Sequence, residues 1–516
     1  MSCNALIKLF IVKHLPRKHK KTEVSEPGRF TLDIIWLTVA QLFVSVIFGI
    51  FTLPALTKSY TSDIYGTWIQ ASATVVLLSP LLSLQLGLAA IKFLSAEEDK
   101  VKRRRYLGSM LLAIILFAVI LAIVSSIFSK QISILLFADS AYIGYVRLIT
   151  LWTIFNALYN FFISYLRARN RIKSVSISYI FITIAQMMVI LGLSRAAADL
   201  ELIIVCIIAV QVIFAFVLFF WIVIDTGFPV PCLDGLRQFL QFSTPQMPGV
   251  VLLWLIGLSD RYFITHLLGL SKDGIYSSSN TIAGLITLFY APISYALFPL
   301  ISRFWAQNRF DDVKKYFVYS IKLYMTFAIP AAVGIYLLSH QLLNILTTSE
   351  FVTEKELVLF LALGAVFLGV YQISINLVLL GKYAKIMPFI TASASIVNIT
   401  INFFLIPRIG IIGAAISNCA AYFILSILTI IWARKTLGFV FDFKYLGKII
   451  IGTFIMWLCI SYLRIDGILG ISALFLSGFL IFFISLMLLK AFSVQDIQFV
   501  KNFLIKLIPD YLKIKK

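Results

Sequence analysis

Acidic residues are scarce in this sequence, and charge of either sign is rare. Asp and Glu number 23 against 44 Lys and Arg, and charged residues make up only 13% of the 516 residues, while 61% are hydrophobic. A soluble domain could not bury so much apolar surface, because many of its residues necessarily lie next to water. The composition therefore excludes an ordinary soluble globule and favours a membrane protein.

Cysteine and histidine are also sparse, with five Cys and four His in the whole chain. Their positions show no paired, metal-like or nucleophile-triad spacing, so we interpret the cysteines as apolar fillers or free thiols. These residues are Cys3, Cys206, Cys232, Cys419 and Cys459, with His14, His19, His266 and His340. We expect no metal, no cofactor and no catalytic activity.

Long hydrophobic runs recur from about residue 33 to residue 490 and predict fourteen membrane spans. Each run is close to the roughly 20 residues that a helix needs to cross about 30 Å of hydrocarbon. No connecting segment is long enough to form a domain, so the predicted fold class is an all-α polytopic membrane protein. The predicted spans are residues 33–56, 64–91, 107–129, 146–166, 174–194, 202–224, 246–269, 275–302, 317–338, 357–380, 386–407, 411–433, 447–464 and 468–490.

The basic residues are distributed unequally between the two sides of these spans. If the N-terminus is inside, and basic residues within spans are counted with the nearer side, the inner side holds 34 of the 44 Lys and Arg and the outer side nine, with Lys322 left inside a span. By the positive-inside rule, both termini are cytoplasmic and the protein lies in the cell membrane. This scatter between hydrophobic runs also explains most of the net charge of +21 and argues against nucleic-acid binding. The basic, hydrophilic first 30 residues predict no cleavable signal peptide.

The two halves of the sequence resemble each other at an offset of 211 to 212 residues. The segment 63–66 (DIYG) opens span 2 as 274–277 (GIYS) opens span 8, and Pro80 lies within span 2 as Pro292 lies within span 8. The basic loop 100–109 also matches 312–320. The offset covers six spans, an even number, so both copies have the same orientation. We therefore predict two parallel six-helix repeats plus two C-terminal helices (6+6+2), with a central cavity between the lobes.

This repeat divides the chain into six parts. They are a basic cytoplasmic N-terminal segment (1–32), an N-lobe of spans 1 to 6 (33–224), a cytoplasmic inter-lobe linker (225–245), a C-lobe of spans 7 to 12 (246–433), spans 13 and 14 (434–490) and a basic amphipathic tail (491–516). Lys and apolar residues alternate in the tail at helical spacing, which is typical of a helix lying on the inner membrane surface.

Asp260 and Arg261 stand next to each other inside span 7. On the insertion scale each costs about 2.5–3.5 kcal/mol near a helix centre, enough to cancel most of the drive for this segment to insert. A watered cavity would reduce that cost. Neighbouring positions on a helix point about 100° apart, so the two side chains cannot form an ideal pair with each other. Two interpretations stay open: a cavity-lining pair that handles substrate or ion, and a structural pair with another helix.

Further polar residues in the spans are candidates for the cavity. Lys92 and Arg303 end spans 2 and 8 at matching inner positions and could flank a cytoplasmic entrance, whereas Lys322 lies two turns into span 9 and could snorkel. Intramembrane amides could contact sugar hydroxyls or form interhelical hydrogen bonds worth about 0.6 kcal/mol each. These amides are Gln41, Gln70, Gln186, Asn280, Gln372, Asn376, Asn398 and Asn402.

The helix count, the repeat and two short motifs resemble the polysaccharide flippase family. The motifs are Asp260-Arg261-Tyr262 in span 7 and Leu268-Gly269 followed by Gly274-Ile275-Tyr276. This family contains the O-antigen and exopolysaccharide repeat-unit translocases of the multidrug/oligosaccharidyl-lipid/polysaccharide exporter superfamily. The resemblance covers residues 33 to 490. It differs from the lipid II flippase branch, which places several arginines in the first two helices, where this chain has Lys58 and then Lys92.

The resemblance implies a substrate and a mechanism. The substrate would be an oligosaccharide on a polyprenyl pyrophosphate, moved from the inner to the outer leaflet by rocking of the lobes, with Arg261 offsetting phosphate charge. A proton or a sodium ion could drive the cycle, and a glycan polymerase or glycosyltransferases could associate with the protein. Two alternatives remain: a multidrug or ion-coupled antiporter of the same fold, and a membrane enzyme acting on lipid-linked sugars, which would need a large outer loop that this sequence lacks.

Overall fold

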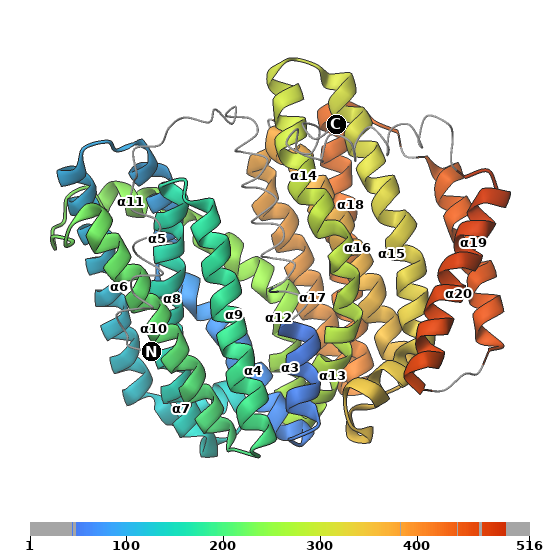
Figure 1. Ribbon diagram of the computed structural model, residues 1–516, viewed down its shortest axis with the longest axis horizontal. Coiled ribbons are helices and arrows are strands. Elements are labelled where there is room, and N and C mark those ends of the chain that lie inside the picture. The colour runs from blue at the N-terminus through green and yellow to red at the C-terminus, as the bar shows by residue number, and fades with distance from the viewer. Residues whose placement is uncertain (1–43, 45–47, 382, 441, 464–466, 492–516) are drawn as a thin grey trace, which may run out of the picture.

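The computed structural model describes residues 44, 48–381, 383–440, 442–463 and 467–491, and its regular structure there is entirely helical (Figure 1). Thirteen helical segments among these residues are long and apolar enough to cross a membrane. The prediction of an all-α polytopic membrane protein is therefore confirmed. The N-terminal segment, most of span 1 and the C-terminal tail lie outside the described residues.

The helices before residue 227 form the first helix group, which lies on the left in Figure 1. Predicted spans 2 to 6 all appear as helices in this group, with ends a few residues from the predicted ones. The group comprises α3 (Phe48–Thr57), α4 (Ser62–Leu82), α5 (Leu86–Ala89), a π-helical turn (Ala90–Leu94), α6 (Lys100–Ile127), α7 (Ser129–Phe137), α8 (Ile143–Ala168), α9 (Ile172–Arg195) and α10 (Leu200–Thr226).

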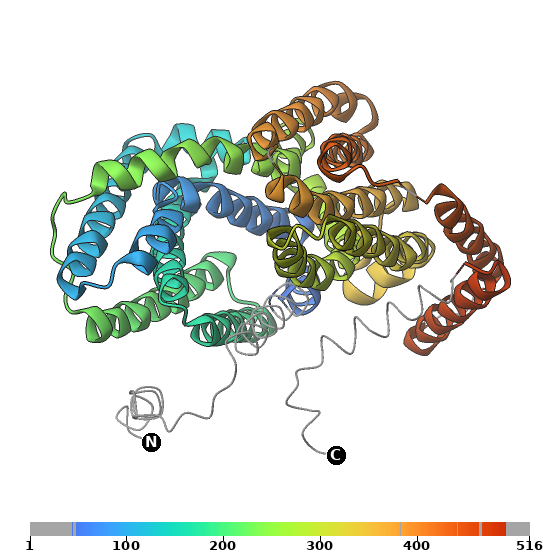
Figure 2. The same cartoon turned by 90° about the horizontal axis from the view of Figure 1, so that it is seen from above.

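A short helix, α11 (Leu236–Ser243), leads into the second helix group. Two more helices, α19 (Phe443–Ser461) and α20 (Gly467–Leu488), pack beside α15 at the periphery of this group (Figure 2). The second helix group comprises α12 (Met247–Leu268), α13 (Leu270–Ala283), α14 (Thr287–Ala306), α15 (Phe310–Leu346), α16 (Lys355–Leu380), α17 (Met387–Ile409) and α18 (Ile411–Leu437).

Spans 2 and 8 are each interrupted, but at different places. In span 2, α4 ends two residues after Pro80, and Leu84 and Gln85 take up left-handed backbone angles (φ 49° and 55°) before α5 begins. Span 8 is interrupted at a 3-10 turn, Gly284–Ile286, and α14 then continues through Pro292. The shared prolines therefore mark the break in span 2 and not the one in span 8.

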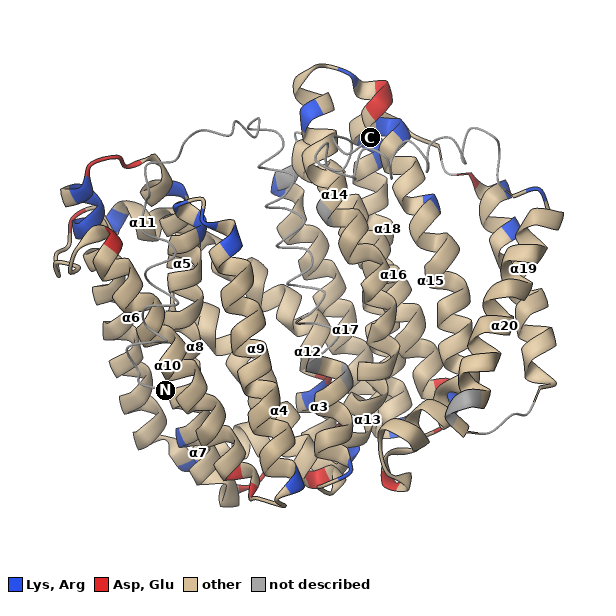
Figure 3. Cartoon of the chain, in the orientation of Figure 1, with Lys and Arg blue, Asp and Glu red and all other residues tan. Residues whose placement is uncertain are grey.

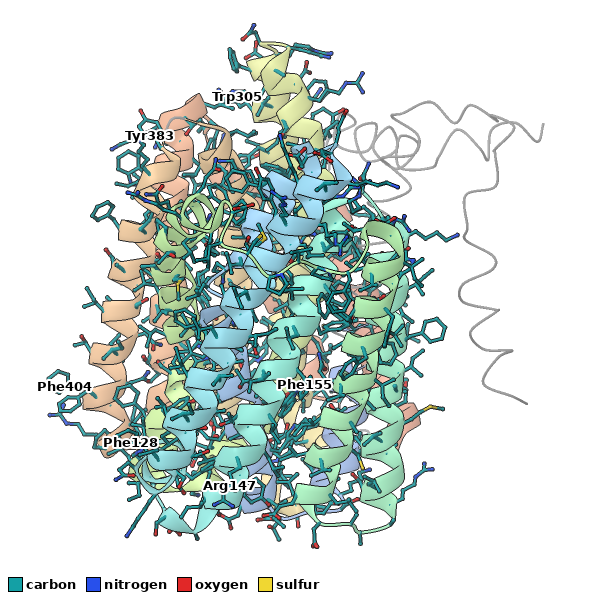
Figure 4. The ribbon with its side chains drawn as sticks, turned by 90° about the vertical axis from the view of Figure 1, so that its left-hand side faces the viewer. Phe128, Arg147, Phe155, Trp305, Tyr383 and Phe404 are labelled. Carbon is teal, nitrogen blue, oxygen red and sulfur yellow. The ribbon has the colours of Figure 1, made fainter. Side chains whose placement is uncertain are left out.

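Apolar side chains cover the outside of the helices. Phe128 and Phe404 are 49% and 53% exposed and project away from the bundle (Figure 4). Along α6 the exposed side chains include Ile115, Leu116, Val119, Ile120, Ile123 and Ile127. Apolar surface of this extent is stable against acyl chains and not against water.

Polar and amphipathic residues mark the two ends of the bundle. Lys and Arg gather along one end, the upper edge in Figure 3, which we call the basic end. Trp305 and Tyr383 lie near this end, and Arg147 lies at the other (Figure 4), which we call the opposite end. Trp, Tyr and basic residues favour the boundary between hydrocarbon and water, because their side chains combine an apolar part with a polar tip.

Candidate functional site

A cavity of about 470 Å³ lies within the first helix group. Helices α3, α4, α8, α9 and α10 surround it, and Thr281 of α13 is the contribution of the second helix group. No Asp, Glu, Lys or Arg is present among the described residues that line it. Gly49 and four aliphatic side chains, Val44, Leu53, Ile69 and Ile182, form part of the lining. The rest consists of hydroxyl, amide and aromatic side chains: Thr52, Tyr65, Trp68, Ser72, Trp152, Asn156, Tyr159, Asn160, Tyr179, Thr183, Gln186, Gln211 and Thr281.

Some polar groups of the cavity are bonded to each other and others have no partner. Gln186 Nε2 donates to Gln211 Oε1 at 3.1 Å, which leaves further donors and acceptors of both amides free for a ligand. Tyr159 Oη and Trp152 Nε1 are buried, and neither has a hydrogen-bond partner in the described part of the chain. Buried donors without partners are costly, so a rearrangement that exposed these two groups to acceptor oxygens of a ligand would be favoured.

The aromatic side chains give the cavity flat apolar surfaces next to these polar groups. Trp68 and Trp152 lie with their ring centroids 5.4 Å apart. An aromatic face beside amide and hydroxyl groups suits a molecule that is apolar on its ring faces and polar at its edges. The volume lies within the roughly 300–1,000 Å³ of small-molecule sites.

Asp260 does not line this cavity. Its side chain is 1% exposed and lies inside the second helix group, where four donors surround the carboxylate. Asn402 Nδ2 and Asn398 Nδ2 donate to Oδ1 at 2.7 and 3.1 Å, and Tyr276 Oη and Asn418 Nδ2 donate to Oδ2 at 2.9 and 3.1 Å. The carboxylate thereby joins α12 to α13, α17 and α18.

Arg261 points to different neighbours, as the helical geometry of adjacent positions predicts. It is 8% exposed, and its Nε donates to Ser277 Oγ at 3.2 Å, while Nη1 donates to the backbone oxygen of Gly257 at 3.4 Å. Asp273 on α13 is fully buried and interacts electrostatically with Arg261. The described residues include no ion pair within 4 Å for either Asp260 or Arg261.

At the opposite end, α4 packs closely against α13. A Cβ atom on Gly66 would lie 2.1 Å from the backbone oxygen of Leu270, and one on Gly274 would lie 2.2 Å from that of Ser62. Ser62 Oγ also lies 2.6 Å from Ser271 Oγ. The two glycines therefore allow a backbone contact between the helix groups that any larger residue would prevent.

Helix α12 makes a second contact with α4, nearer the centre of the bundle. Trp254 Nε1 donates to the backbone oxygen of Ala73 at 3.0 Å, and Tyr262 Oη lies 2.6 Å from Thr74 Oγ1. The side chains of Trp254 and Tyr262 also contact each other edge to face, with centroids 5.2 Å apart. Two helices of the second group thus hold α4 in the conformation described here.

The remaining predicted site residues are not brought together. Lys322 Nζ forms an ion pair with Asp442 at 2.7 Å, close to the start of α19. Lys92 is exposed at the basic end, with Nζ 4.0 Å from the centroid of the Phe242 ring, and Arg303 is exposed at the end of α14.

The predicted amide residues also lie apart from one another. Gln70 lies on α4, where its Nε2 donates to the Leu136 backbone oxygen at 2.7 Å, and Asn280 lies half-buried on α13. Gln41 lies outside the described residues.

Sequence reasoning missed several polar residues that the structure places at these sites. Asp273 was assigned to the loop before span 8, but α13 begins at Leu270 and buries it. Asn156 and Asn160 line the cavity and share one face of α8 at i, i+4 spacing, a signal that was available in the sequence. The hydrogen bond from Asn418 to Asp260 could not be predicted from the sequence, because it depends on the packing of α12 against α18.

Comparison with known families fits this fold. The family model described as "Polysaccharide biosynthesis protein" matches residues 30–305, and the MatE model matches residues 245–404. The chain belongs to the polysaccharide biosynthesis protein family. The family predicted from the motifs and the helix count is therefore confirmed.

Two curated proteins are similar to parts of the chain. An uncharacterized membrane protein of Methanocaldococcus jannaschii is 25% identical over 278 residues, which is 53% of this chain and 54% of that protein. The probable low-salt glycan biosynthesis flippase Agl15 of Haloferax volcanii is 22% identical over 239 residues, 45% of this chain and 49% of that protein. The chain thus spans about half the length of the curated relatives it matches.

Solved structures share the fold of the chain at low sequence identity. The lipid II flippase MurJ, in an inward closed conformation, superposes with a TM-score of 0.74 and 18% identity, covering 87% of this chain and 98% of that one. An inward-facing multidrug resistance transporter of the MATE family gives a TM-score of 0.64 and 12% identity, covering 79% and 98%. The chain therefore has the same fold as these two transporters.

Proposed function

We propose that the protein is a flippase that moves an oligosaccharide linked to a polyprenyl pyrophosphate from the cytoplasmic to the outer leaflet. The observation that carries this proposal is the cavity of the first helix group, whose described lining includes amides, hydroxyls and aromatic rings and no charged side chain. Sugar rings have apolar faces and hydroxyl-bearing edges, which match aromatic and amide groups respectively. The similarity to the Haloferax volcanii flippase supports the same conclusion.

The energetic need for such a cavity follows from the cargo. Moving one hydroxyl group into hydrocarbon without a hydrogen bond costs roughly 2–7 kcal/mol, so an oligosaccharide cannot cross the bilayer unaided. The proposed cavity replaces water at the sugar hydroxyls, while the polyprenyl tail stays in the lipid. The transport cycle would be alternating access between two lobes, residues 33–224 and 246–433.

We assign the basic end to the cytoplasm by the positive-inside rule, which places both termini inside. Lys92 and Arg303 are exposed at that end and would meet the diphosphate as cargo enters. Asp260 and Arg261 are enclosed in this conformation. We therefore propose that they serve the conformational cycle, and that Arg261 meets phosphate only if the contact between α4 and α13 opens.

A multidrug antiporter of the same fold is the second candidate, because the MatE family model matches residues 245–404. Many multidrug substrates are cations, which would favour a carboxylate in the cavity. No Asp or Glu is found among the described lining residues. The cavity therefore favours a glycan over a cationic drug.

The proposal is tested with purified protein in liposomes that contain a fluorescent lipid-linked oligosaccharide in both leaflets. Flipping is measured as the fraction of fluorophore that a membrane-impermeant reductant can reach with time. We expect Gln186→Ala to slow flipping at least several-fold, and Gln131→Ala, on the exposed face of α7, to leave it unchanged. If the wild type extrudes a cationic dye and does not flip the lipid, the antiporter is the correct function.

A further inference from the structure

Two carboxylates lie near one guanidinium where α12 meets α13, and their surroundings differ. Asp260 accepts four hydrogen bonds, from three amides and a phenol. Asp273 accepts one, from Ser277 Oγ at 3.3 Å, and its Oδ2 atom is buried without a partner in the described part of the chain. The donors around Asp260 therefore stabilise its ionised form, whereas Asp273 has too few donors to stabilise a negative charge.

The charge of this group is unbalanced if both carboxylates are ionised. Asp260, Arg261 and Asp273 are 1%, 8% and 0% exposed, so a net charge of −1 would be enclosed within the membrane protein. An unpaired buried charge costs several kcal/mol, and such groups usually take up a proton instead. One proton balances the charge, and it belongs on the carboxylate that has fewer donors.

We propose that Asp273 is a proton-binding site that is occupied while α4 and α13 are in contact and is vacated when they separate. Among the residues described, the groups that interact electrostatically with Asp273 are Arg261, Asp260 and Tyr262 on α12 and Tyr65 on α4. A further acid, Glu350, accepts a hydrogen bond from the backbone N–H of Ser62 at the contact between α4 and α13. The two tyrosines are neutral at physiological pH. The charge on Asp273 is therefore decided by Arg261, Asp260 and access to water.

The contact between the helix groups controls that access. Asp273 precedes Gly274, which lies against the backbone of Ser62 on α4, and Ser271 contacts the same serine. Separation of α4 from α13 would admit water from the opposite end to the carboxyl group. The O–H bond of Asp273 then breaks, the proton passes to water and the carboxylate remains; closure takes up one proton again. Low pH therefore favours the closed contact, because that state binds one proton more.

This inference goes beyond the proposed function, because it holds for any cargo. The first test compares infrared spectra of the full-length wild type and two variants in lipid at pH 7. A protonated carboxyl group gives a carbonyl stretching band that a carboxylate lacks. We expect this band in the wild type and in Asp63→Asn, an exposed acid of α4, and we expect its loss in Asp273→Asn. A wild type without the band, or a band that persists in Asp273→Asn, overturns the proposal.

The second test follows the helix contact itself, and its first outcome needs only the wild type. Hydrogen exchange of residues 270–283 is measured by mass spectrometry between pH 5.5 and 8.5, corrected for the intrinsic pH dependence of exchange. In the wild type we expect corrected exchange to rise with pH by up to about tenfold per unit, the limit for one linked proton. In Asp273→Asn, which resembles the protonated form, exchange stays slow and does not change with pH. A wild type without pH dependence, or an unchanged slope in the variant, overturns the proposal.

Discussion

Asn402 Nδ2 lies 2.7 Å from Asp260 Oδ1, the shortest of the four hydrogen bonds that hold this carboxylate. The bond joins α17 to α12 inside the second helix group. A hydrogen bond to a buried charge contributes more to stability than one between neutral groups. The polar cluster around Asp260 is therefore a structural element of the second helix group in this conformation.

Asn402→Ala should lower the free energy of unfolding by about 1–2 kcal/mol, because it removes one donor from a buried carboxylate. Unfolding in detergent, followed by intrinsic fluorescence as denaturant is added, measures the loss. The control is Ser393→Ala on the exposed face of the same helix, where the hydroxyl donates to the backbone oxygen of Phe389. An equal effect of both substitutions would mean that the Asp260 cluster does not stabilise the fold.

Gly274→Ala should separate the two helix groups at the opposite end, because its Cβ would lie 2.2 Å from the backbone oxygen of Ser62. Relieving that overlap costs about 1–3 kcal/mol in the closed conformation. We expect faster hydrogen exchange in residues 62–66 and 270–274 and a lower melting temperature. Gly192→Ala on α9 is the matched control, since no atom of the described residues lies within 4 Å of its added Cβ. If Gly274→Ala exchanges like Gly192→Ala, the backbone contact does not hold the groups together.

Hydropathy alone predicted the positions of the helices. It did not predict which residues surround Asp260. Runs of apolar residues located the described spans because a membrane helix needs a set length. Asp260 and Arg261 also stood out, because two charges inside an apolar run are costly. Their partners could not be predicted, since Asn398, Asn402 and Asn418 reach Asp260 from other helices, and sequence does not specify that register.

Asp273 was missed for a local reason. Gly269, with φ at +92°, lets α13 begin at Leu270 directly after α12 ends, so the polar stretch that resembles a loop is helical. The sequence predicted a cavity between the lobes and named Gln186 as a candidate for it, but it did not predict a cavity within the first helix group. Hydropathy does not distinguish a helix face toward lipid from a face toward a cavity.

The ion pair between Asp442 and Lys322 should make a contribution to stability that depends on pH. The hydrogen bond from Lys322 Nζ lowers the pKa of the Asp442 carboxyl below its usual value, so this group is more acidic in the folded than in the unfolded protein. A lowered folded-state pKa contributes stability above the unfolded pKa of about 3.9, and this contribution is lost as pH falls through the folded pKa. The pair should therefore stabilise the attachment of α19 at neutral pH and cease to do so in acid.

Asp442→Asn isolates this ion pair, because asparagine can still accept the backbone N–H of Tyr445 and preserve the helix cap. At pH 7 we expect a loss of less than about 1 kcal/mol, since the pair is partly exposed. The difference from wild type should shrink as pH falls below about 4. Melting temperatures of wild type and variant across this range measure it, with Asp139→Asn, another exposed cap, as control. A difference that is constant with pH would assign the effect to the cap and not to the charge.

A substitution of Tyr159 can distinguish an effect on stability from an effect on cargo binding. Its hydroxyl is buried and has no hydrogen-bond partner among the described residues, so Tyr159→Phe removes no bond that the protein makes. The free energy of unfolding should change by less than about 0.5 kcal/mol or rise slightly, because a buried unsatisfied group is removed. If the hydroxyl contacts sugar oxygens, flipping in liposomes should fall several-fold in the same variant. Tyr462→Phe, whose side chain is 81% exposed on α19's C-terminal side, is the matched control and should flip at the wild-type rate. A Tyr159→Phe protein that is equally stable and flips normally would show that this side of the cavity does not hold the glycan.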